Sequence, residues 1–265
     1  MGGPPAIAAQ PATVRATRYV TPLREGGSLP ALMEADDDGL YVVKFRGAGQ
    51  GAKALVAELV AGELARRLGL LVPEIVFVEL DPVLGRAEPD PEIQDLISAS
   101  AGLNIGLDFL PGALPFEPAA GVPVDPAQAA AVVWFDALVA NVDRTPRNPN
   151  LLVWHERLWL IDHGAALHMH HQTWRFADLA ARPFPMIRDH VLLPCAGSVL
   201  EADERLAPLL DRATLDEIAA LVPGEWLGEP ADERRAVYAD YLGARLEQPR
   251  GFAEEAERAR LEASR

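Results

Sequence analysis

Short runs of mainly apolar residues, separated by polar and turn-forming residues, recur along the first 110 residues of the chain. Runs of this length between turn signals are typical of β-strands. The runs expected to form strands are 17–23, 29–34, 40–46, 75–80 and 105–110. Turns rich in glycine and aspartate separate the first three runs, so an antiparallel meander is expected there.

Helical periodicity appears between these runs and dominates the second half of the chain. In the first half it predicts helices over 53–68 and 90–100. In the second half, helices are expected up to residue 140, within 198–221 and over 230–246, with a hairpin at 151–154 and 157–161. Asp125 and Pro126 supply the N-cap and the first-turn proline of the helix that ends near residue 140.

A proline-rich stretch at 111–126 divides this pattern into two parts. We therefore expect a disordered tail over 1–14, a small lobe over 15–110 and a larger lobe over 111–265. The expected fold class is α+β, with a small antiparallel sheet and one helix in the first lobe and mainly helices in the second.

Charge and composition limit the classes of function. The 265 residues contain 24 Lys and Arg against 39 Asp and Glu, a net charge of −15. Binding to a nucleic-acid backbone needs basic surface that displaces counterions, so no direct nucleic-acid partner is expected. The longest apolar stretch, 127–140, is interrupted by Gln128 and Asp136 and is too short to span a bilayer. Because no secretory signal begins the sequence, the protein is expected to be cytoplasmic.

Two segments of the second half contain residue types suited to phosphoryl transfer. Asp143 precedes Asn148 by five residues, and Asp162 begins an Asp-His-Gly turn after the predicted hairpin. Transfer from ATP needs one carboxylate that orients an acceptor hydroxyl, and an amide oxygen and a second carboxylate that hold Mg²⁺. The five-residue separation of Asp143 and Asn148 is that between the base and the amide ligand in a kinase catalytic loop. Asp162 stands where the carboxylate that binds the metal would be.

The first half supplies residues expected at the phosphates of the nucleotide. Lys44 is one of only two lysines in the chain, and it ends a Val-Val-Lys strand pattern suited to neutralising phosphate charge. Glu58 or Glu63 on the next predicted helix is a candidate partner that would orient this lysine.

Backbone groups are expected to complete the nucleotide site. A turn whose N–H groups would cover the phosphates contains Gly26, Gly27 and Ser28. The segment between the two halves, where the adenine would meet the backbone, contains Asp108, Phe109 and Leu110.

Residues 58–73 follow the pattern Glu-x5-Leu-Ala-x2-Leu-Gly-x2-Val-Pro. Together with 141–148 and Asp162, this pattern resembles the HipA-like kinases, which belong to the wider protein-kinase-like fold that includes the phosphoinositide kinases. The resemblance covers about residues 15–190. It implies a two-lobed protein-kinase-like fold and an ATP- and Mg²⁺-dependent phosphotransferase that acts on a hydroxyl group.

The resemblance also implies a role for each candidate residue. Glu58 rather than Glu63 would be the partner of Lys44, and Glu63 is expected to be solvated or to cap its helix. Asp143 would be the catalytic base. The magnesium ligands would be Asn148 and Asp162; Pro149 suggests that only one of Asn148 and Asn150 points inward.

Three questions stay open on the sequence alone. The acceptor hydroxyl could belong to a protein serine or threonine, a lipid or a small alcohol, because all of them suit one aspartate base. A catalytically silent pseudokinase that binds nucleotide is one alternative function. A metal enzyme is another, since four histidines lie within nine residues and imidazole is a common zinc ligand. These histidines are His163, His168, His170 and His171.

Two neighbouring segments receive simpler interpretations. The histidine-rich segment lacks a regular ligand spacing, so it is expected to be the counterpart of a kinase activation loop. The glycine-rich stretch 47–53 departs from the phosphate-loop motif, because Ala52 and Ala54 stand where that motif needs Gly and Ser or Thr. It is expected to be a flexible link between strand and helix.

Overall fold

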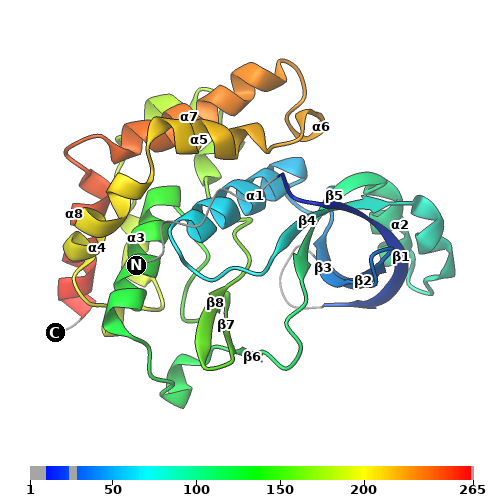
Figure 1. The fold of residues 1–265 in the computed structure, drawn as a ribbon, viewed down its shortest axis with the longest axis horizontal. Helices are drawn as coiled ribbons and strands as arrows, with labels where there is room; N and C mark the ends of the chain where they lie inside the picture. Colours follow the sequence, from blue (N-terminus) through cyan, green and yellow to red (C-terminus); the bar gives the residue numbers. More distant parts are fainter. Residues whose placement is uncertain (1–9, 24–28, 264–265) are drawn as a thin grey trace.

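The computed structural model describes residues 10–23 and 29–263, which form an N-terminal barrel beside a helical C-terminal part (Figure 1). Within these residues five strands close into the barrel in the order β1-β2-β3-β5-β4. The strands are β1 (Thr13–Pro22), β2 (Ala31–Ala35), β3 (Leu40–Lys44), β4 (Ile75–Leu80) and β5 (Gly102–Asp108). The overall class is therefore α+β, as the sequence predicts.

The barrel closes through a pairing that the sequence does not predict. Strands β1, β2 and β3 form the expected antiparallel meander. However, β1 also pairs parallel to β4, with Thr13 opposite Phe77, so the sheet is not purely antiparallel. Because β1 begins at Thr13, the expected tail over 1–14 is too long; residues 1–9 lie outside the described part of the chain.

Two helices accompany the barrel, at the segments 53–68 and 90–100 that are predicted to be helical, although the expected fold class names only one helix there. Helix α1 (Ala52–Arg67) follows β3, and its residues 55–65 are all buried. Helix α2 (Pro91–Ala99) begins where the Asp90 side chain accepts a hydrogen bond from the Glu92 N–H at 3.0 Å. Its residues Ile93 and Ile97 pack into the barrel core, which makes α2 part of this half of the protein. The prediction of a single helix beside the sheet is therefore wrong.

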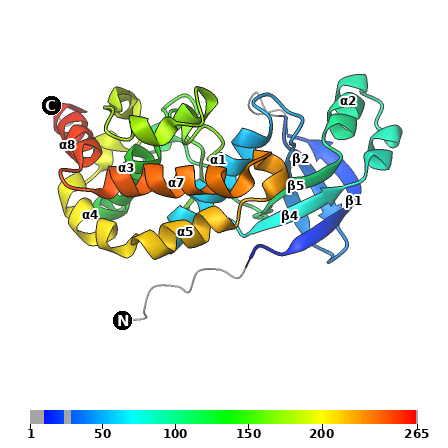
Figure 2. The ribbon, with the colours of Figure 1, turned by 90° about the horizontal axis from the view of Figure 1, so that it is seen from above.

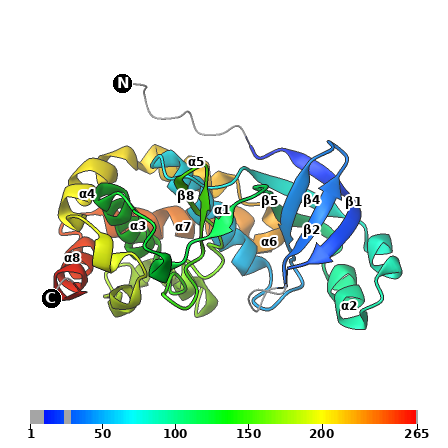
Figure 3. The ribbon, with the colours of Figure 1, turned by 90° about the horizontal axis from the view of Figure 1, so that it is seen from below.

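The C-terminal part is mainly helical, and its helices extend from the end of the molecule far from the barrel to the side of the barrel itself (Figure 3). They are α3 (Pro126–Val139), α4 (Val199–Leu206), α5 (Arg212–Ala220), α6 (Gly224–Leu227), α7 (Ala231–Leu246) and α8 (Gly251–Ala263). A small sheet beside them contains β6 (Leu114–Pro115), β7 (Leu151–Trp154) and β8 (Arg157–Leu160). In the described ranges no helix has the length and apolar character needed to cross a membrane.

Helix α3 is the central helix of this part because almost its whole surface is apolar. Residues 129–139 are all buried, and the helix starts at Asp125, whose side chain accepts from the Ala127 N–H at 3.1 Å. At its other end Arg245 of α7 donates to the carbonyls of Ala137 and Leu138, both at 2.8 Å. A buried cation thus satisfies the last carbonyls of the helix that leads into residues 141–150.

The C-terminal helices also contact the barrel directly, along α1 (Figure 2). In α6, the Trp226 indole donates to the carbonyl of Leu103 at 3.1 Å and packs edge-on against Phe77. Next to it, Glu225 forms an ion pair of 2.7 Å with Arg46. The last third of the chain therefore holds the barrel on the side of α1.

The contacts of Arg245 predict a large effect on stability. Arg245→Met keeps the apolar stem but leaves three buried carbonyls without their donor, because Ala180 also accepts from Arg245 at 2.9 Å. We expect the free energy of unfolding to fall by about 2–4 kcal/mol in urea titrations. The matched control is Arg212→Met, whose exposed ion pairs are worth no more than about 1 kcal/mol. Equal losses in the two variants would contradict this role of Arg245.

Candidate active site

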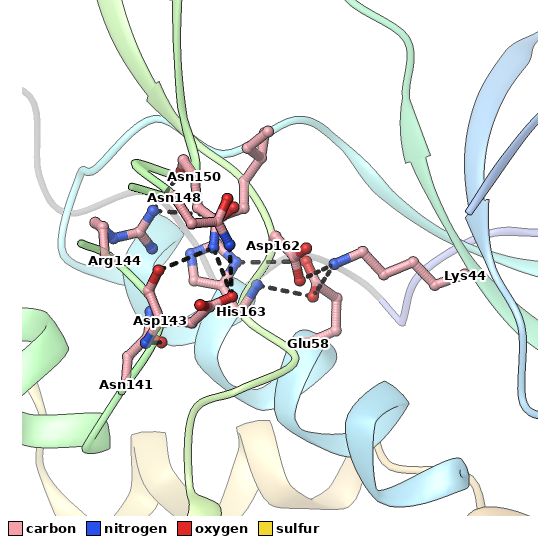
Figure 4. A network of polar contacts seen from close by, with 10 residues as sticks. Lys44, Glu58, Asn141, Asp143, Arg144, Asn148, Asn150, Asp162 and His163 are labelled. Carbon is pink, nitrogen blue, oxygen red and sulfur yellow. Dashed lines mark hydrogen bonds and ion pairs between the residues drawn. The ribbon is translucent and has the colours of Figure 1, made fainter. Parts of the chain in front are cut away.

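Lys44 at the end of β3 contacts two carboxylates from distant parts of the chain (Figure 4). Its Nζ lies 2.6 Å from Glu58 Oε2 in α1 and 2.6 Å from Asp162 Oδ1, two residues after β8. The Glu58 side chain is fully buried, that of Lys44 is 10% exposed and that of Asp162 is 34% exposed. These three predicted residues therefore meet at one point, with the Asp162 carboxylate the most open to solvent.

The two buried charges depend on each other. Burial disfavours the charged form of Lys44, but Asp162 and Glu58 outweigh burial and raise the pKa of the lysine. Burial likewise acts against the Glu58 carboxylate, and Lys44 and His163 outweigh it and lower the pKa of Glu58. Both groups are therefore ionised at neutral pH. Removing Lys44 would leave the Glu58 carboxylate buried without its lysine, whereas removing Glu58 would leave Lys44 with Asp162 as its partner.

Glu63 does not take part in this contact. It lies one and a half turns beyond Glu58 on α1 and is 4% exposed, so the expectation that it is solvated or caps the helix is wrong. Its nearest basic partner is Arg66, at 3.8 Å, and burial raises the pKa of Glu63. The side chain lines a separate cavity, together with Glu74 and Trp159.

Asp143 lies in the loop after α3, among three asparagines. Its N–H donates to Asn141 Oδ1 at 3.1 Å, and its Oδ2 accepts from Asn148 Nδ2 at 2.7 Å and from Asn150 Nδ2 at 3.2 Å (Figure 4). Both asparagines thus contact Asp143, but only Asn150 is buried and Asn148 is exposed. Burial raises the pKa of Asp143 even though these amides favour its ionised form.

A buried network beneath this loop was not predicted from the sequence. The Asp136 carboxylate in α3 is fully buried and accepts from Asn141 Nδ2 at 2.9 Å and from Arg144 Nε at 2.5 Å. His190 Nε2 lies 2.9 Å from the same carboxylate. Burial acts against this charge, and Arg144 and His190 together lower the pKa of Asp136. The available signal was the acidic residue within an otherwise apolar helix.

Arg144 connects the two halves of the site. Besides Asp136, its guanidinium donates to the carbonyl of Asn150, and to that of Ile161 at 3.3 Å. Ile161 immediately precedes Asp162, whose backbone adopts a left-handed conformation with φ of 54°. A non-glycine residue in this region is strained and needs support from its surroundings. The same buried arginine thus supports both the Asp143 loop and the Asp162 turn.

A cavity of about 390 Å³ lies in front of these residues. Its polar end contains Lys44, Asn148, Asn150 and Asp162. Its apolar lining includes Pro30, Val42, Leu107, Leu152 and Ile161. The segment predicted to meet an adenine, Asp108, Phe109 and Leu110, also lines this cavity. The other predicted nucleotide residues, Gly26, Gly27 and Ser28, lie outside the described residues.

The backbone between the two halves has hydrogen-bonding groups that face no partner. The Phe109 N–H donates to the Leu40 carbonyl at 2.9 Å, and the Leu110 carbonyl accepts from Ala113 at 3.1 Å. Among the described residues, the Phe109 carbonyl and the Leu110 N–H form no hydrogen bond. Both groups belong to one trans peptide unit and point in opposite directions, so one of them at a time can face a ligand in the cavity.

The clustered histidines have separate structural contacts. His163 stands after Asp162; its ring packs edge-on against Phe135, and its N–H donates to Glu58 Oε2 at 2.8 Å. His170 Nδ1 lies 3.0 Å from the Tyr238 hydroxyl, and His168 Nδ1 lies 3.1 Å from a backbone carbonyl. In residues 10–23 and 29–263, no group of three or more His, Cys, Asp or Glu side chains is arranged to hold a metal ion. These contacts do not favour a histidine-metal enzyme.

The donor set at the polar end of the cavity fits Mg²⁺. Asp162 and Asn148 both line it, and the Asn148 side chain uses its Nδ2 on Asp143, which leaves its carbonyl oxygen as an acceptor. Mg²⁺ prefers oxygen ligands and is usually held by one or two carboxylates together with substrate phosphates.

Comparison with known proteins agrees with this geometry. A family model described as HipA-like kinase matches residues 17–248. The crystal structure of the Helicobacter pylori proinflammatory kinase CtkA has a similar fold, with a TM-score of 0.50 and 14% sequence identity. That match covers 89% of this chain and 98% of the CtkA chain. A search of curated proteins found no match. Because the family match spans most of the sequence, the protein belongs to the HipA-like kinases.

Proposed function

We propose that this HipA-like kinase transfers the γ-phosphate of ATP to a hydroxyl acceptor in a Mg²⁺-dependent reaction. The observation that carries the proposal is Lys44, whose ammonium group contacts both Glu58 and Asp162 at 2.6 Å beside the cavity. Under this proposal the barrel with α1 and α2 is the small lobe of a two-lobed kinase, and residues 111–265 form the large lobe.

The apolar end of the cavity suits the adenine. Val42, Leu107 and Ile161 would pack against the faces of the ring. One polar group of the Phe109–Leu110 peptide, its carbonyl or its N–H, would face the polar edge of the ring. The unengaged peptide group between Phe109 and Leu110 supports this placement, because buried polar ligand edges need such partners.

The polar end suits the triphosphate. Lys44 would contribute a fixed positive charge, held in place by Glu58 on the side away from the cavity. Asp162 and Asn148 would hold Mg²⁺, which supplies charge neutralisation to the phosphates during transfer. Fixed charges in a site that excludes water stabilise the developing charge without reorganisation.

Asp143 would orient the acceptor hydroxyl and take its proton. Its carboxylate is held by Asn148 and Asn150, so that it is positioned before the acceptor arrives. The raised pKa of Asp143 brings its basicity closer to that of a useful proton acceptor. Protein serine and threonine, lipids and small alcohols all supply such a hydroxyl; a protein side chain is the acceptor class we propose to test first.

The metal and nucleotide ligands predict a thermal shift that depends on Asp162. We expect Mg²⁺ with ATP to raise the melting temperature of the wild-type protein, because a ligand that binds only the folded state stabilises it by mass action. Asp162→Asn should lose this rise, whereas Asp216→Asn, a change at an exposed carboxylate on α5, should keep it. A rise that persists in Asp162→Asn would remove Asp162 from the metal site.

Replacing the proposed base should separate binding from chemistry. Asp143→Asn keeps the size of the side chain and its amide contacts, so nucleotide binding should survive. We expect the rate of ADP release to fall by about 10²–10⁴-fold, the usual contribution of a general base. Full activity in Asp143→Asn would contradict the assignment, and ATP binding without turnover in the wild type would identify a pseudokinase.

The raised pKa of Asp143 predicts an acid limb in the activity profile. The group acts as a base only when ionised, so the rate of ADP release should fall by about tenfold per pH unit below the pKa of Asp143. Because that pKa is raised, the fall should begin at higher pH than for an ordinary aspartate. The residual rate of Asp143→Asn should lack this limb; an identical limb in the variant would assign it to another group.

A further inference from the structure

A cluster of cationic side chains lies outside the contacts used so far. Lys53 of α1 and Arg234 of α7 both lie over the ring of Trp174, at 4.6 and 4.5 Å from its centroid. Lys53 Nζ also donates to the carbonyl of His170, and His171 Nε2 lies 3.0 Å from His170 Nε2. The cluster thus joins α1, α7 and the histidine-rich segment.

Neither of the two permanent cations in this cluster has an acidic partner in the described part of the chain. This is notable in a protein of net charge −15, where acidic side chains outnumber basic ones. Burial is the main cause that lowers the pKa of Lys53, and the positive charge of Arg234 lowers it further. Burial also lowers the pKa of His171, and Lys53 and His168 add to this effect. The charges therefore repel each other, and a bound anion would relieve that repulsion.

The cluster is close to the proposed catalytic centre. Lys53 lies on the same helix as Glu58, five residues before it. Gly164, two residues after Asp162, lies against the next residue of that helix, since a Cβ on the glycine would be 3.8 Å from the Ala54 Cβ. An anion held by Lys53 would thus act on the helix that positions the Lys44–Glu58 pair.

The segment between Asp162 and Ser198 contains a single hydroxyl side chain, Thr173. It lies between His171 and Trp174 and is half-buried, and its Oγ1 accepts from the Arg175 N–H at 3.0 Å. The one residue of this segment that can become a phosphate ester is therefore close in sequence to the cluster: it follows His171 by two residues and directly precedes Trp174.

We propose that Lys53, Arg234 and His171 bind a phosphate monoester, and that its source is Thr173 of this protein. The assignment of Thr173 as the source of the phosphate ester rests on the proposed kinase function. The bond between the γ-phosphorus of ATP and its bridging oxygen breaks, a bond from Thr173 Oγ1 to that phosphorus forms, ADP leaves, and the hydroxyl proton passes to Asp143 of the transferring copy. A phosphate dianion forms charge-assisted hydrogen bonds with Lys and Arg and can order a segment. The bound ester fixes α1 against the histidine-rich segment.

The site itself is tested without ATP. The melting temperature of the full-length protein is measured with inorganic phosphate at matched ionic strength. We expect a saturable rise of about 3–5 °C near ten times Kd. Lys53→Met and Arg234→Met should each lose it, and Arg175→Met, an exposed arginine of the same segment paired with Asp178, should keep it. No rise in the wild type, or an equal rise in Lys53→Met and Arg234→Met, would overturn the site.

The source is tested by peptide mass spectrometry after incubation with Mg²⁺ and ATP. We expect phosphate on Thr173 in the wild type, none in Asp143→Asn, and loss of the inorganic phosphate shift in the modified protein. ADP release with Thr173 unmodified would overturn Thr173 as the source and assign the site to a phosphate carried by the acceptor. An absence of ADP release would contradict the kinase proposal, while the inorganic phosphate titration would still decide the cationic site.

Discussion

The burial of one positive charge organises the barrel and everything that faces it. Lys44 is almost fully enclosed, and a lysine in that position is stable only with carboxylates in direct contact. Glu58 must therefore come from a helix that crosses behind the barrel, and Asp162 from a turn 118 residues further along the chain. This single requirement sets the position of α1 relative to β3 and the approach of the C-terminal part.

Asp136 imposes a second, parallel requirement inside the C-terminal part. Its carboxylate is as deeply buried as Glu58, and it takes its partners from the loop after α3 and from His190. Arg144 is held by Asp136 and in turn donates to the carbonyls of Asn150 and Ile161, the second of which directly precedes Asp162. The two buried ion pairs thus converge on the same turn, which explains how a strained backbone at Asp162 is maintained.

Much of this arrangement could be predicted from local pattern, and what could not be predicted is non-local. Strand β4 follows from its short run of apolar residues, and the bounds of α1 and α2 follow from caps and glycine or proline stops. The spacing of Asp143 and Asn148 in the sequence indicates that their side chains lie together, because a short loop fixes the distance between them. The parallel closure of the barrel and the pairing of Asp136 with His190 depend on which distant segments meet, and no periodicity encodes that. Glu63 was misjudged because a charged residue on α1 is buried by helices that lie far ahead in sequence.

The contact between α6 and the barrel has a mechanical consequence. The barrel is joined to the remainder of the protein by the chain after β5 and, on the side of α1, by Trp226 and the ion pair of Arg46 with Glu225. The last third of the polypeptide therefore limits how far the barrel can move relative to the C-terminal part when ligands enter or leave the cavity.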